Sequence, residues 1–342
     1  MPTLTSPQSH ISTRPSIRMQ PLRFHPILKR AVWGGQRLGN EFRKPIGELT
    51  DCAESWEISD LPGSESVVAG GRFDGMTLRQ LMMSHRQQVM GVHSNRERFP
   101  LLMKLLDANR PLSVQVHPGG HLGEPDSGQD PSKAELWIVL DAQPGNQMSI
   151  GLKPGITRAE LEAAIQSHEV PACLHTFEAK PGECYFLPPG TVHSLGAGIL
   201  IAEVQQTCNV TYRLDDWGRL GTEGRPRDLH IQQALEVIDF SLGPIGAVMP
   251  QSMDEHPGVA QFIDNQYFAA RRLSGPSAIS IPQDNRAHVL TLVSGTARIE
   301  ADGSLMMMRG DAVLLPAQRP HTQIELDGAA ALLDCYLGEN AG

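Results

Sequence analysis

Short runs of apolar residues that alternate with polar ones dominate this chain, and they predict strands more often than helices. The segment 112–117 places an aliphatic residue at every second position and then stops at Pro118. The runs 135–140 and 200–204 are largely apolar at consecutive positions, which is typical of strands that are buried on both faces. The chain also contains 33 glycines and 26 prolines, enough to supply turns between many short elements. The pattern therefore predicts a β-rich protein.

Three segments have the spacing of helices instead. Residues 77–89 carry Leu78, Leu81 and Met82 at positions that fall on one helical face. Thr157-Arg-Ala-Glu160 is a capping box that opens a second helix, which we expect to run to about residue 168. Residues 229–237 form a third candidate. We expect these helices to decorate a β scaffold.

A repeated pattern of turn and histidine residues indicates that this scaffold is doubled. In each copy a glycine and an acidic residue are followed by a proline and then a histidine, and the copies are offset by 128 positions. The pattern matches the second half of a cupin motif, which belongs to a double-sheet jelly roll. The two copies are Gly182-Glu183, Pro188 and His193, and Gly310-Asp311, Pro316 and His321.

The predicted fold is therefore all-β with a few decorating helices, built from two tandem cupin units (double-stranded β-helices, or jelly rolls). We predict a disordered leader at residues 1–20. A metal-binding unit with the helical decorations is expected at 21–245, and a degenerate cupin unit at 258–342.

Composition narrows the class of function. The 29 Lys and Arg residues against 38 Asp and Glu give a net charge of −9, which argues against nucleic acid as a partner. No apolar run approaches the ~18 residues of a membrane span. The five cysteines are widely spaced and include no Cys-x-x-Cys pair, so we expect free thiols and a cytoplasmic protein. The sequence does not predict an oligomeric state.

Candidate metal ligands lie on three of the predicted strands. Gln115 and His117 are two residues apart and therefore project to the same face. Glu135 opens an apolar run, and His193 follows the tight turn 187–190. Two imidazoles, one carboxylate and one carboxamide make a ligand set suited to zinc, although a strand histidine is more often only hydrogen-bonded.

The second unit lacks part of this set. It contains His288 and His321 but no glutamate in the position that Glu135 occupies. Because two neutral imidazoles alone hold a divalent ion poorly, we expect this unit to be free of metal and its histidines to be structural.

The sequence around these residues resembles that of the type I mannose-6-phosphate isomerases. The matching segments follow one another in order between about residues 25 and 220. Only 58 positions separate Glu135 from His193, which is similar to the short bacterial form of this family. The segments are Val32–Gly35, Glu54–Ser59, Phe99–Asp107, Leu112–Pro118, Ser132–Trp137, Tyr185–Ser194 and Glu203–Trp217.

The resemblance implies a metal-dependent aldose–ketose isomerase. It would interconvert mannose 6-phosphate and fructose 6-phosphate by moving a proton between C2 and C1 through a cis-enediol. The implied cofactor is one divalent metal, with zinc favoured, and the implied partner is a small sugar phosphate. The implied ligands are Gln115, His117, Glu135 and His193.

The resemblance also suggests which residues act on the substrate. Arg213 matches the catalytic arginine of the family, and the alternative for it is a surface ion pair with Asp215 or Asp216. Lys133 lies two residues before Glu135, so both face one cavity, and Glu203 is a further cavity carboxylate. Lys133, Glu203 and a metal-bound water compete for the role of proton shuttle. The resemblance assigns Lys104 and Ser113 to substrate and phosphate contact, against the alternative of solvent exposure.

Two other classes of function fit parts of the pattern. A cupin with two histidines and one carboxylate also describes a non-haem Fe(II) oxygenase. In such a site Gln115 would fill a position that O₂ needs. A non-enzymatic sugar-phosphate-binding protein, such as a sensor, is the second alternative. The sequence has no DNA-binding helix pair or basic patch through which a sensor would act.

Overall fold

The computed structural model describes residues 18–119, 132–253, 257–339 and 341. Residues 1–17 of the predicted leader lie outside the described residues. Met19, near the start of the described chain, is buried, and its amide donates to the Gln318 carbonyl at 2.9 Å.

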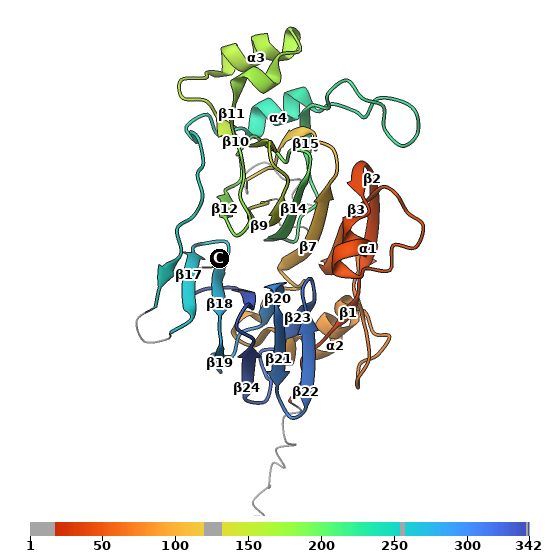
Figure 1. The fold of residues 1–342 in the computed structure, drawn as a ribbon, viewed down its shortest axis with the longest axis vertical. Helices are drawn as coiled ribbons and strands as arrows, with labels where there is room; N and C mark the ends of the chain where they lie inside the picture. The colour runs from red at the N-terminus through yellow and green to blue at the C-terminus, as the bar shows by residue number, and fades with distance from the viewer. Residues whose placement is uncertain (1–17, 120–131, 254–256, 340, 342) are drawn as a thin grey trace, which may run out of the picture.

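Two double-sheet units make up the molecule, which confirms the predicted mostly-β fold (Figure 1). In the first unit a five-stranded sheet faces a six-stranded one. The five-stranded sheet has the order β11 (Leu174–Phe177), β10 (Met148–Leu152), β13 (His193–Ser194), β8 (Val114–Val116) and β15 (Tyr212–Asp215). The six-stranded sheet has the order β12 (Cys184–Leu187), β9 (Glu135–Ala142), β14 (Ile199–Gln206), β7 (Leu101–Ala108), β3 (Cys52–Ile58) and β2 (Ile27–Gly35).

The second unit repeats this plan with six strands against four. The six-stranded sheet has the order β16 (Gln251–Ser252), β17 (Val259–Asp264), β18 (Ala269–Ser274), β25 (Ala331–Tyr336), β20 (His288–Ser294) and β23 (Ala312–Leu315). The four-stranded sheet has the order β19 (Ser277–Ile281), β24 (Thr322–Leu326), β21 (Thr296–Glu300) and β22 (Ser304–Met308). Two short pairs, β1 (Phe24–His25) with β6 (Val67–Val68) and β4 (Asp60–Leu61) with β5 (Ser64–Glu65), complete the strands.

The three predicted helices are confirmed. They are α2 (Leu78–Met90), α3 (Arg158–Gln166) and α4 (Ile231–Val237). Thr77 and Thr157 cap α2 and α3, each through a complete capping box. The sequence did not predict α1 (Arg37–Phe42), a short helix without a side-chain cap, or the 3₁₀ turns Gly91–His93 and Val170–Cys173. None of the helices among the described residues has the length and apolar character needed to cross a membrane.

Successive side chains along the central strands of the first unit point alternately into two different environments. Leu136, Ala202 and Met103 face a large apolar core that also contains Val289 and Leu333 of the second unit. The next residues along the same strands face the interior of the first unit. The two units therefore share one core, and the opposite face of the first unit's six-stranded sheet is available for a site.

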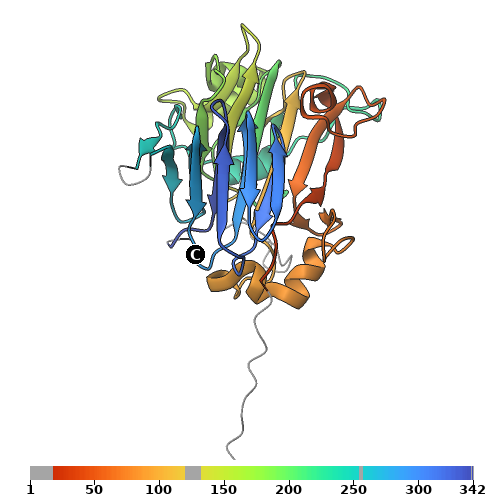
Figure 2. The same ribbon diagram turned by 60° about the horizontal axis from the view of Figure 1, so that its bottom comes forward.

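The N-terminal segment belongs physically to both units. Leu22 exchanges two backbone hydrogen bonds with Leu314 of β23, at 2.8 and 2.9 Å. The end of α2 is also tied to the second unit, because the Ala317 amide donates to the Val89 carbonyl at 2.9 Å. Figure 2 shows this helical region, in orange, below the blue strands of the second unit. The boundaries 21–245 and 258–342 stay a prediction.

The predicted repeat corresponds to two turns with the same hydrogen bonds. Gly182 and Gly310 have φ values of 87° and 89°, a conformation that favours glycine. In each turn the acidic residue accepts from the backbone amide three positions earlier, at 2.9 Å in both Glu183 and Asp311. The histidines at the end of the repeat differ, since His193 is buried and His321 is exposed.

A buried charged cluster occupies the interior of the second unit. His288 lies opposite Leu315 as Glu135 lies opposite Leu187, so a histidine stands where the first unit has its carboxylate. The His288 imidazole pairs with Asp334 at 2.8 Å, and Arg271 pairs with the other oxygen of Asp334 at 2.8 Å. Burial alone would raise the pKa of Asp334, but His288 and Arg271 hold it at about 2.

We expect Asp334→Asn to destabilise the protein by about 3–5 kcal/mol, because it leaves the buried Arg271 guanidinium without its carboxylate and the His288 imidazole with only the more distant Asp284. Thermal and denaturant unfolding measure this loss, with Asp302→Asn at an exposed position as the control. The folded pKa of Asp334 lies below the unfolded one, so its contribution is present above about pH 4 and lost as the pH falls towards 2. An Asp334→Asn protein that unfolds like the control would contradict this.

Candidate metal centre

The predicted site residues gather on the inner face of the first unit. Trp56, Lys104, Glu203 and Trp137 are successive cross-strand partners on β3, β7, β14 and β9, so they form one row across the six-stranded sheet. Glu135 lies two residues before Trp137 on the same face. Alternating apolar and polar positions in otherwise buried strands thus place two carboxylates and a lysine inside the unit.

Three of the predicted ligands converge. One donor atom from each of His117, Glu135 and His193 lies within 4.8 Å of the others, and all three side chains are buried. The turn before His193 depends on Gly190, whose φ is 84° and whose amide donates to the His117 carbonyl at 2.9 Å. This bond ties the two histidine-bearing segments together.

Both imidazoles are oriented by their outer nitrogen. Nδ1 of His117 lies 2.9 Å from the Val210 carbonyl, and Nδ1 of His193 lies 2.9 Å from the Thr191 carbonyl. A carbonyl only accepts, so each Nδ1 carries the proton and each Nε2 is left as a lone-pair donor towards Glu135. Burial, followed by the charge of Lys133, lowers the pKa of His117 to about 3, and burial also lowers the pKa of His193. The imidazoles are therefore neutral at neutral pH, which is the form that binds a metal.

Gln115 lies next to this trio. Its Nε2 is 3.2 Å from Nε2 of His193, and its Oε1 accepts from the Ser113 hydroxyl at 3.1 Å. The carboxamide thus reaches the donor atoms with its nitrogen, and rotation of the amide plane would present the oxygen to a cation.

Lys133 contacts two of the three candidate metal ligands. Its Nζ is 2.8 Å from Oε1 of Glu135 and 3.1 Å from Nε2 of His117. Burial alone would raise the pKa of Glu135, but the charge of Lys133 holds it well below its usual value. Glu135 is accordingly ionised, as a metal ligand must be.

Glu203 and Lys104 form a second buried pair. Their Oε1 and Nζ atoms are 3.0 Å apart, and the side chains are only 4% and 5% exposed. This excludes the alternative that Lys104 is a solvent-exposed lysine. Burial, followed by the charge of Glu135, raises the pKa of Glu203 to about 7. Burial alone would lower the pKa of Lys104, but the charges of Glu203 and Glu54 raise it.

Arg213 lies on β15, after the strands that carry the candidate ligands, and it pairs with Gln115 of β8. The alternative ion pairs are not present among the described residues. Asp216 binds Arg219 and Arg227 at 2.7 and 2.5 Å, and Asp215 accepts from a backbone amide. Nε of Arg213 is buried without a hydrogen-bond partner in the described part of the chain.

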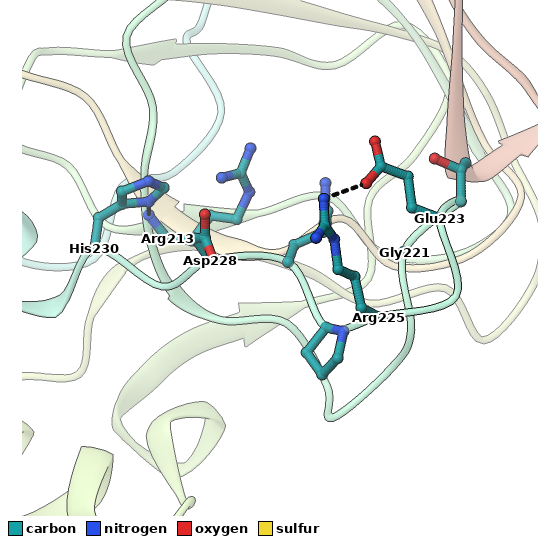
Figure 3. Close-up of a pocket in the computed structure, with 9 residues that line it drawn as sticks. Arg213, Gly221, Glu223, Arg225, Asp228 and His230 are labelled. Atoms are coloured by element: carbon teal, nitrogen blue, oxygen red, sulfur yellow. Dashed lines mark hydrogen bonds and ion pairs between the residues drawn. The ribbon is translucent and has the colours of Figure 1, made fainter.

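Arg213 also lines a cavity of about 480 Å³ (Figure 3). In that view Arg213, Asp228 and His230 lie at one end, and Glu223 and Arg225, which pair at 2.6 Å, lie at the other. The lining residues are Arg213, Gly221, Thr222, Glu223, Arg225, Pro226, Arg227, Asp228 and His230.

Sequence reasoning missed two contributors to the site. His230 accepts from the Arg213 amide at 3.2 Å and returns its own amide to the Arg213 carbonyl, so it fixes the backbone of β15. No local pattern indicated this contact. Trp137 could have been found, because it lies two residues after Glu135 and must share its face.

Comparisons with known proteins agree on one family. The model of the phosphomannose isomerase type I catalytic domain matches residues 22–147. The mannose-6-phosphate isomerase ManA of Bacillus subtilis is 31% identical over 299 residues, which are 87% of this chain and 93% of that protein. The mannose-6-phosphate isomerase of Streptococcus mutans is 31% identical over 298 residues, or 87% of this chain and 92% of that protein.

Solved structures are similar over nearly the whole chain. The crystal structure of mannose 6-phosphate isomerase from Bacillus subtilis has a TM-score of 0.85 at 29% identity and covers 93% of this chain and 100% of that one. The enzyme from Salmonella typhimurium, solved with fructose 6-phosphate and zinc bound, has a TM-score of 0.73 at 19% identity and covers 94% and 100%. The second likeness concerns the fold alone. Sequence identity above 30% sustained along both chains, on the same fold, establishes that the chain belongs to the type I phosphomannose isomerase family.

Proposed function

We propose that this protein interconverts mannose 6-phosphate and fructose 6-phosphate. The observation that carries the proposal is the convergence of two neutral imidazoles and an ionised carboxylate beside a second carboxylate with a pKa of about 7. Family membership supports the same activity, because the relatives are mannose-6-phosphate isomerases.

The proposed cofactor is one divalent metal, with zinc favoured by the mixed nitrogen and oxygen donors. His117, Glu135 and His193 would hold it, and Gln115 would supply the fourth ligand after its amide turns. A bound dication supplies a Lewis acid that polarises a carbonyl and stabilises the negative charge of an enediolate. Four protein ligands leave less room for O₂ than an oxygenase needs, which favours the isomerase.

Glu203 is the proposed proton shuttle. A carboxyl group whose pKa is about 7 can accept a proton from one sugar carbon and return it to the neighbouring one at neutral pH. The ion pair with Lys104 orients the carboxylate, so Lys104 would act on the reaction through Glu203 as well as by any contact with the sugar. Lys133 is the alternative proton carrier, since its Nζ reaches Glu135 and His117.

Arg213 and Ser113 are proposed to bind the substrate. The guanidinium is permanently charged and offers several donors, and it lies beside the ligand strand at the edge of a cavity. The Ser113 hydroxyl is buried and already orients Gln115, so it would contact the substrate from the ligand side.

The decisive test is a coupled assay for fructose 6-phosphate. We expect the metal-replete protein to isomerise mannose 6-phosphate, to lose this activity after treatment with a chelator, and to regain it when zinc is returned. A metal-replete preparation that isomerises no phosphorylated aldose would rule the proposal out. Oxygen uptake that requires Fe(II) and an added substrate would point to the oxygenase instead.

A further inference from the structure

Trp137 contributes a single hydrogen-bond donor between two buried carboxylates. Its Nε1 is 3.1 Å from Oε2 of Glu135 and 3.1 Å from Oε2 of Glu203. The side chain is 1% exposed, so water does not compete for these bonds. An indole has one N–H and accepts nothing, so both carboxylates are fixed relative to the same proton.

The remaining oxygen of each carboxylate points elsewhere. Oε1 of Glu135 lies 3.1 Å from Nε2 of His117, and Oε1 of Glu203 lies 3.0 Å from Nζ of Lys104. Trp137 therefore occupies one oxygen of Glu135 and leaves the other directed at the imidazole. The oxygen bonded to Trp137, Oε2, lies 3.9 Å from Nε2 of His193, so each oxygen of Glu135 has a fixed direction towards one of the two imidazoles.

The strand register explains why one side chain reaches both groups. Trp137 follows Glu135 by two positions on β9 and stands directly opposite Glu203 on β14. Its ring also meets the His193 imidazole edge-on, with centroids 5.3 Å apart at 86°. Because the indole is neutral, it orients the carboxylates without cancelling the negative charge that attracts a dication.

We propose that Trp137 is a positioning residue that ties the metal ligand Glu135 to Glu203. It touches neither sugar nor metal, and it acts by fixing the direction of Glu135 and the separation of the two carboxylates. The role of Glu203 in this inference rests on the proposed function. The effect of Trp137 on metal affinity does not depend on turnover.

The test compares Trp137→Phe with Trp33→Phe. Both tryptophans are buried in the same apolar cluster, and for Trp33 no bond to a carboxylate occurs in the described part of the chain. Both variants lose similar volume, so Trp33→Phe controls for loosened packing. We expect Trp137→Phe to bind zinc about 10–100-fold more weakly in competition with a chromophoric chelator, and Trp33→Phe to bind it as the unmodified protein does.

Kinetics give a second readout. Loss of the tie to Glu203 is expected to lower kcat while KM changes little, because binding of the sugar does not use the indole. Trp137→Phe should lower kcat less in a Glu203→Gln background than in the unmodified protein, since the two residues act as a unit. A purely structural tryptophan would give the same factor in both backgrounds.

The outcomes separate this inference from the proposed function. Zinc affinity in Trp137→Phe equal to that in Trp33→Phe overturns the inference, even if the protein is an isomerase. Weaker zinc binding in Trp137→Phe alone supports it, even if no sugar is turned over.

A readout in the unmodified protein covers the case in which Trp137→Phe does not fold. The chain has four tryptophans, so nitrogen-15 labelling gives four indole N–H signals. Removal of Trp33, Trp56 and Trp217 one at a time identifies the signal of Trp137. That signal should shift on titration with zinc, and a signal that stays in place overturns the inference.

Discussion

Glu135→Ala is expected to lose most of its bound metal and to lower kcat by about 10³-fold or more. A metal that stabilises developing charge contributes several kcal/mol, and each 1.4 kcal/mol is a factor of ten in rate. The substitution also leaves the buried Lys133 ammonium without the carboxylate that now lies 2.8 Å away. The metal content measured by elemental analysis should fall well below the one equivalent per chain expected of the unmodified protein.

Two comparisons make this result specific. Glu135→Gln keeps the shape of the side chain, so loss of metal in both variants assigns the effect to the charge and not to a cavity. A His288→Ala, His321→Ala double variant should keep its metal although it melts earlier, because His288 is part of the buried cluster with Asp334. Retention of metal in Glu135→Ala and its loss in the double variant would place the working site in the second unit.

Arg213→Ala is expected to lower kcat by about 10²–10³-fold while metal content and melting temperature stay close to those of the unmodified protein. Removal of one pre-organised donor to a developing oxyanion typically has this effect. The stability should change little because the guanidinium has no carboxylate partner among the described residues. Steady-state kinetics and thermal unfolding of the same preparations measure both.

Two further variants test whether the planar guanidinium of Arg213 is needed. Arg213→Lys keeps the charge but not the planar set of donors, so it should recover only part of the lost rate. Arg298→Ala removes an exposed arginine that pairs with Glu325 in the second unit, and it should leave kcat unchanged. If Arg213→Ala keeps its rate and melts much earlier, the arginine has a structural role and the catalytic assignment is wrong.

Local periodicity was enough to predict part of the site. Gln115 and His117 are two residues apart on one strand, as are Glu135 and Trp137, so a shared face follows from the sequence alone. The capping box at Thr157 likewise predicted the start of one helix, because a cap depends on residues three positions apart.

Cross-strand contacts could not be predicted in this way. The pairing of Lys104 with Glu203 depends on the register of β7 and β14, which are about a hundred residues apart in sequence. The same holds for Asp334, which pairs with His288 and Arg271 from two other strands. The sequence also could not separate His288 from His321, which were both expected to be structural, although the first side chain is buried and the second is exposed.

The bonds between Leu22 and Leu314 join two segments that are far apart in the sequence. During synthesis the first of these residues leaves the ribosome long before the second exists, so this strand pairing must wait until Leu314 has been made. The apolar face shared by Met103 and Val289 is exposed to water in the meantime. Since long-range β pairing is slow, the growing chain passes through a stage in which the first unit is present but this apolar face is uncovered, a condition that favours aggregation.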